Sequence, residues 1–120
     1  MRVLVAFEDE YRVYSAAITG AVRRARPTDK VVMANIGVLE REVRGFTPHL
    51  IISSLPAPTN YSGEWFSWVR LSLDPNRPSE ICVEGNCRES LNPGLGELLC
   101  VLEETEGLLV GSNQGPRGAR

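Results

Sequence analysis

Two short apolar segments constrain the fold of this chain more than any other feature. The first, residues 3–7, is followed by three acids, Glu8, Asp9 and Glu10; the second, residues 50–52, is followed by Ser53 and Ser54. Uninterrupted apolar runs of this length are typical of strands buried on both faces of a parallel sheet. Because the carboxyl ends of parallel strands share one edge, we expect a pocket there with an acidic wall and a neutral, hydroxyl-bearing centre.

The first half of the chain alternates strand and helix. Apolar patterning predicts a strand over 2–7, a helix over 11–26, a strand over 30–35, a short helix over 38–44 and a strand over 50–54. Pro27 ends the first helix, because proline disfavours helical backbone in the residue before it. Such alternation predicts an α/β fold with a parallel sheet and right-handed crossovers.

The second half has a different pattern. Residues 55–80 are rich in proline, and within them the aromatic stretch 65–73 is predicted to form an extra strand or hairpin arm. A buried strand over 80–84 is expected to stop at Gly85. The last helix starts at Asn92 and Pro93 and ends near Leu109. We expect one domain over 1–109 and a disordered tail over 110–120.

Composition excludes several classes of function. The formal net charge of −2 gives no positive potential that would attract nucleic acid or an anionic membrane. No apolar run approaches the ~20 residues of a membrane span, and the N-terminus lacks a signal-peptide pattern. We therefore expect a cytoplasmic protein with neither nucleic acid nor membrane as a partner.

The cysteine pattern predicts no metal and no cofactor. Four residues separate Cys82 from Cys87, there is no matching second pair, and the single histidine, His49, is distant in sequence. Cys82 and Cys100 stand in apolar surroundings, which favours small core residues. Cys87 is expected to face solvent.

These motifs resemble the response-regulator receiver domain of two-component signalling. Residues 8–10 are similar to the acidic turn after its first strand, and residues 48–52 are similar to the run that leads to its phosphorylation site. Asn92 and Pro93 are similar to its Lys-Pro turn. The resemblance implies a flavodoxin-like parallel sheet, in which a Pro/Trp-rich strand-loop segment replaces the third and fourth helices.

The departures from the receiver pattern suggest the function. The position of the phosphoacceptor aspartate in receivers is occupied here by Ser54 (or by Ser53, with a one-residue slip). The position of the receiver lysine is occupied by Asn92. A serine without a base cannot replace the carboxylate nucleophile. We therefore expect no enzyme, but a stand-alone, phosphorylation-incompetent receiver-like module that acts through protein–protein interaction in signalling or regulation. Its pocket remnant would comprise Glu8, Asp9, Ser53, Ser54 and Asn92.

The densest aromatic stretch has two interpretations. Tyr61, Trp65, Phe66 and Trp68 could bind a protein partner, including a second copy of the chain, because Trp and Tyr dominate interface energetics. They could equally belong to the core. A spacing of three places Trp65 and Trp68 on opposite faces of a regular strand, so we expect one to be buried and one accessible.

Two functions other than a receiver-like module stay open. In the first, the acidic pocket serves a small enzyme or ligand-binding protein, with Glu8 and Asp9 holding a divalent cation weakly. These acids could instead have a structural role and complement the dipole of the first helix. In the second, the chain is a structural or antitoxin-like partner protein.

Overall fold

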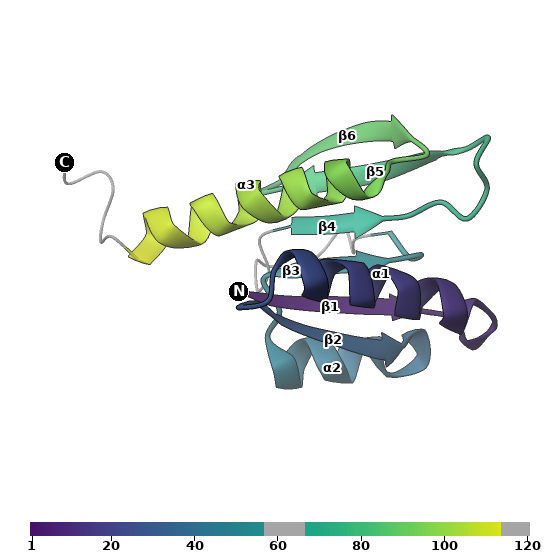
Figure 1. Ribbon diagram of the computed structural model, residues 1–120, viewed down its shortest axis with the longest axis horizontal. Helices are drawn as coiled ribbons and strands as arrows, with labels where there is room; N and C mark the ends of the chain where they lie inside the picture. Colours follow the sequence, from purple (N-terminus) through teal and green to yellow (C-terminus); the bar gives the residue numbers. More distant parts are fainter. Residues whose placement is uncertain (57–66, 114–120) are drawn as a thin grey trace.

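The computed structural model describes residues 1–56 and 67–113, which form an α/β unit built on a six-stranded mixed sheet (Figure 1). Three α-helices and two single 3-10 turns accompany the strands in this part of the chain. In sequence order the elements are β1 (Arg2–Phe7), η1 (Asp9–Tyr11), α1 (Arg12–Ala25), β2 (Lys30–Asn35), η2 (Ile36–Val38), α2 (Leu39–Phe46), β3 (Leu50–Ser53), β4 (Ser67–Arg70), β5 (Pro78–Val83), β6 (Asn86–Leu91) and α3 (Leu95–Asn113).

The sheet is parallel in its first half and antiparallel in its second. Its strand order is β2-β1-β3-β4-β5-β6, and β1 to β4 pair in parallel. The β4–β5 and β5–β6 pairs are antiparallel, so the expected parallel sheet is present only from β1 to β4. Residues 71–77 are too few for the crossover of about a dozen residues that a parallel connection needs. As a result β6 again runs in the direction of β1.

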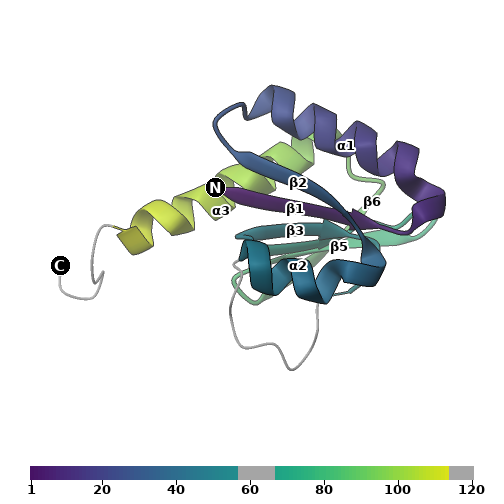
Figure 2. The same ribbon diagram turned by 90° about the horizontal axis from the view of Figure 1, so that it is seen from below.

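The helices cover both faces of the sheet. Figure 2 shows α1 and α3 on one face and α2 on the other. The larger core cluster lies under α1 and α3 and includes Val5, Val22, Ile52 and Leu102, which are fully buried. The smaller cluster lies under α2 and includes Leu4, Ile51 and Trp68. The apolar runs predicted to be buried on both faces supply both clusters.

Trp68 belongs to the core. Its side chain is 4% exposed, and Nε1 donates a hydrogen bond of 2.7 Å to the carbonyl of Leu55. Of the two interpretations of the aromatic stretch, Trp68 fits the core one. Tyr61, Trp65 and Phe66, the other aromatic candidates, lie outside the described residues.

The strand expected to stop at Gly85 does so: β5 ends at Val83, and Gly85 forms a turn with Glu84, at positive φ of 85° and 51° respectively. The edge strand β6 that follows the turn at Asn86 was not expected. Cys82 and Cys87 face each other across the two strands and form a disulfide. Cys82 is buried as predicted, but it is not a free core thiol. Cys100, expected in the core, is free and exposed.

The last helix differs from its predicted bounds. It begins at Leu95 and continues past Leu109 to Asn113. Residues such as Gly and Ser near its end each cost only a fraction of a kcal/mol to about 1 kcal/mol in a helix, which a long helix tolerates. Residues 114–120 of the predicted tail lie beyond the described part. Within that part, none of the helices combines the length and the apolar character that crossing a membrane requires.

Candidate functional site

The candidate site lies where the direction of strand order reverses. From β1 the chain passes through α1 to β2 on one side, and then through α2 to β3 on the other side of β1. Because α1 and α2 cover opposite faces, a crevice forms at the carboxyl ends of β1 and β3, the usual ligand position in open α/β sheets. Glu8 follows β1 and Ser54 follows β3. Ser54 Oγ donates a hydrogen bond of 2.7 Å to Glu8 Oε1.

A small cavity of about 130 Å³ lies beside this hydrogen bond, between α1 and the end of β2. Asp9 lines it and accepts a hydrogen bond of 2.6 Å from Asn35 Nδ2, with Arg12 at 3.4 Å. Ser15, on the buried face of α1, also lines it. Its hydroxyl is buried and forms no hydrogen bond within the described residues. A cavity of this size with an unpaired hydroxyl has room for water or a small polar group.

An open cleft of about 410 Å³ lies on the other side of Glu8. Its charged walls carry both signs, because Arg70 and Arg77 line it together with Glu8 and Asp74. Arg77 and Asp74 are themselves 3.7 Å apart in an exposed ion pair. The cleft therefore has no strong preference for an anion or a cation.

Ser53 and Asn92, the other two residues of the predicted pocket, do not line the crevice at Glu8 and Ser54. Ser53 is fully buried, and its hydroxyl accepts a hydrogen bond from the backbone N–H of Leu55, so it shapes the turn after β3. Asn92 stands at the same sheet edge, after β6, but lines a separate groove. Glu8, Asp9 and Ser54 thus lie at one site, whereas Asn92 does not reach it.

The groove at Asn92 is aromatic. It has a volume of about 290 Å³ and lies between the start of α1 and the loop after β4, with Tyr11, Tyr14, Leu73 and Pro75 in its wall. The ring of Tyr14 is 42% exposed and packs edge-to-face on Phe7, with 5.6 Å between ring centroids. This contact orients the ring of Tyr14.

The one histidine of the chain lies far from Ser54. His49, the one histidine, stands at the opposite end of β3, where its backbone N–H donates to the carbonyl of Arg2. Burial, and then the charge of Arg2, lower the pKa of His49. Ser54 therefore has a carboxylate rather than an imidazole as its partner. No trio of carboxylate, thiol or imidazole ligands gathers around Glu8 and Asp9 in the described ranges.

Sequence reasoning missed Ser15, Arg70 and the tyrosine groove. Ser15 lies on the buried face of α1, which could not be identified from apolar residues alone. The buried positions of this helix are Ser15, Ile18, Thr19 and Val22. Two of these four are polar and give no hydrophobic signal. Arg70 ends β4, and its place in the cleft beside Glu8 depends on the pairing of β4 with β3, which the sequence alone does not give.

Comparisons with protein-family models, curated proteins and solved structures found no match to this chain. The resemblance to receiver domains therefore stays a prediction from the residues.

Proposed function

We propose that this chain is a phosphorylation-independent, receiver-like module that binds a protein partner in signalling or regulation. The observation that carries the proposal is the hydrogen bond between Ser54 and Glu8. Ser54 stands where a receiver would present its nucleophilic carboxylate, and its hydroxyl is paired with the acid that would otherwise face a metal. An alcohol paired in this way is a poor nucleophile, because the Glu8 carboxylate is far less basic than an alkoxide and the one histidine stands at the opposite end of β3.

The topology supports a receiver-like ancestry for half of the sheet. The strand order β2-β1-β3-β4 corresponds to the first four strands of the flavodoxin-like order. The antiparallel β5 and β6 depart from it and rebuild the face through which a receiver would bind its partners. The partner-binding surface therefore cannot be taken over from receiver domains and is inferred from the surface of this chain itself.

The groove with Tyr11, Tyr14, Leu73 and Pro75 is the surface we favour for the partner. Tyrosines supply large contact areas at a small cost in side-chain entropy, and Tyr14 is already ordered by Phe7. The half-exposed apolar walls suit an aromatic or branched side chain of the partner, and Asn92 can offer its amide to the partner's backbone.

A photo-crosslinking amino acid at position 14, compared with one at position 13, tests this proposal. Val13 is the matched control because it is 85% exposed on the same helix but does not line the groove. We expect position 14 to capture one defined protein, whose purified form then binds the wild-type chain and binds Tyr14→Ala at least about tenfold more weakly. Equal capture from both positions would count against the groove.

Phosphorylation is tested separately, with acetyl phosphate and Mg²⁺. We expect the intact mass to stay unchanged. A phosphate added to Ser54 or Ser53 would contradict the proposed function, whatever the result at the groove.

The unpaired hydroxyl of Ser15 favours a second candidate, a small polar ligand or hydrated cation in the cavity beside Asp9. Any ligand that binds the folded state must raise the melting temperature by mass action. A rise with millimolar Mg²⁺ that Asp9→Asn abolishes would support this function instead. Glu10→Gln is the control, since Glu10 does not line the cavity.

A further inference from the structure

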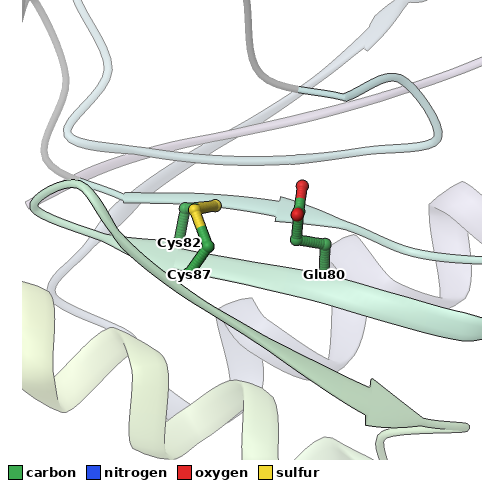
Figure 3. Close-up of side chains that lie close together, drawn as sticks. All are labelled: Glu80, Cys82 and Cys87. Atoms are coloured by element: carbon green, nitrogen blue, oxygen red, sulfur yellow. A yellow bond between two sulfur atoms is a disulfide. The ribbon is translucent and has the colours of Figure 1, made fainter. Parts of the chain in front are cut away.

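The β5–β6 hairpin gathers three metal-ligating side chains on one face. Figure 3 shows Glu80 and Cys82 of β5 beside Cys87 of β6, all on the side of the hairpin away from α3. The two sulfurs and a Glu80 carboxylate oxygen all lie within 4.8 Å of one another. This is the one such trio among residues 1–56 and 67–113.

The register of the hairpin explains why they meet. Cys82 pairs directly with Cys87 across the strands, and Glu80 stands two residues before Cys82, on the same face. The opposite face of β6 is used otherwise: Arg88 and Ser90 contact Glu104 and Glu97 of α3. The placement of the trio follows from the alternation of side chains along a strand.

Glu80 has no evident structural duty in this position. Its cross-strand neighbour on β4 is Arg70, but Arg70 Nη2 donates instead to the carbonyl of Pro78, at 3.3 Å. The Glu80 carboxylate forms no hydrogen bond or ion pair with any described residue. A half-buried carboxylate beside two sulfurs, with its oxygens uncommitted, is a ready third ligand.

The ability of the cluster to bind a metal ion depends on the redox state of Cys82 and Cys87. As a disulfide, neither sulfur carries the negative charge that a metal ligand needs. A dithiol reductant transfers two electrons to the S–S bond, which becomes two thiols while the reductant becomes a disulfide. Each thiol then loses its proton on metal binding. Two thiolates and one carboxylate form a donor set that suits Zn²⁺ at three positions, with water at the fourth.

We propose that reduction of the Cys82–Cys87 disulfide opens a zinc site formed by the two thiolates and the Glu80 carboxylate, and that oxidation closes it. The hairpin is then a redox-controlled metal site, separate from the cleft at Glu8 and Ser54. In a reducing compartment the metal-binding state prevails, whereas an oxidising one favours the disulfide.

Co²⁺, used as a spectroscopic stand-in for Zn²⁺, tests the proposal on the full chain. After reduction and removal of the reductant without air, we expect one equivalent of Co²⁺ to give a thiolate-to-metal charge-transfer band and visible bands of tetrahedral coordination. Zn²⁺ should displace it. The oxidised protein should give neither signal, and far-ultraviolet circular dichroism reports whether the reduced chain keeps its fold.

Matched variants identify the ligands. Glu80→Gln should weaken Zn²⁺ binding by at least about tenfold, the lower end of what losing even an outer-shell partner costs. Glu89→Gln should not, although Glu89 is the cross-strand neighbour of Glu80. Cys100→Ser should leave binding unchanged. The proposal is overturned if the reduced wild type shows no thiolate–Co²⁺ band, if the two Gln variants bind equally well, or if Cys100→Ser removes the band.

Discussion

The backbone N–H of Arg2 donates a hydrogen bond of 2.9 Å to Nδ1 of His49. Nδ1 can accept this bond only while it carries no proton, because protonation turns it into a donor. Burial of the imidazole and the charge of Arg2 act in the same direction and lower the pKa of His49. The contact between β1 and the start of β3 therefore depends on a neutral histidine.

Stability should fall as the pH drops below about 6.5, the ordinary pKa of histidine. The folded pKa lies below the unfolded one, so in this window the unfolded chain binds more protons and is favoured. His49→Asn keeps an acceptor for the Arg2 N–H but does not titrate. Free energies of unfolding measured between about pH 7.5 and about pH 5 should fall less steeply for this variant than for the wild type. Equal slopes would show that His49 has no part in the pH dependence.

A buried pair of hydroxyls joins β4 to α3 and yields a second prediction. Ser67 Oγ and Thr105 Oγ1 are 2.6 Å apart, and Thr105 donates its proton to the carbonyl of Val101. Ser67 must then donate to Thr105. Thr105→Val leaves the Ser67 hydroxyl buried without an acceptor, at a cost of about 1–3 kcal/mol.

Adding Ser67→Ala to Thr105→Val should restore part of the loss, because both polar partners are then gone. Denaturant unfolding of the two single variants and the double variant measures this coupling. Strict additivity would mean that the two hydroxyls do not share a hydrogen bond in solution.

The packing of Trp68 under α2 gives a third prediction. Trp68→Ala removes a large side chain from the smaller core cluster and should cost about 3–5 kcal/mol. Trp68→Phe keeps most of the apolar volume but loses the hydrogen bond to the Leu55 carbonyl, so it should cost less. Val13→Ala, at an exposed helical position, should change the free energy of unfolding by less than about 0.5 kcal/mol. A Trp68→Ala variant that melts like the wild type would contradict its place in the core.

How far the sequence predicts this fold depends on how deeply each element is buried. β1 and β3 are covered on both faces, so their apolar runs could be recognised directly, and the meeting of Glu8 with Ser54 follows from the parallel pairing of these strands. β6 lies at the edge of the sheet with nearly all its residues exposed, so it carries no apolar pattern from which a strand could be predicted. The disulfide cannot be predicted without it, since Cys87 is seen to face Cys82 only once the register of β6 is known.

The turn between β5 and β6 should hold the hairpin together without the disulfide. A cross-link that closes so short a loop, with a sequence separation of 5, stabilises by about 2 kcal/mol in the chain-entropy description. We expect reduction to lower the free energy of unfolding by about that amount while the far-ultraviolet circular dichroism of the folded state persists. Complete loss of the folded signal on reduction would show that the hairpin depends on its cross-link.

The same turn offers a stabilising substitution. Glu84 and Gly85 both have positive φ, as a two-residue type I′ turn requires, and a non-glycine residue there costs roughly 1–2 kcal/mol. Asparagine tolerates this backbone best among residues with side chains, so Glu84→Asn should stabilise the protein by about 0.5–1 kcal/mol. Gly85→Ala, which forces a Cβ into the same region, should destabilise it. Denaturant unfolding in both redox states measures these effects. If Glu84→Asn destabilises the oxidised and reduced forms alike, the turn in solution is not of this type, and the register that brings Glu80, Cys82 and Cys87 together would need another cause.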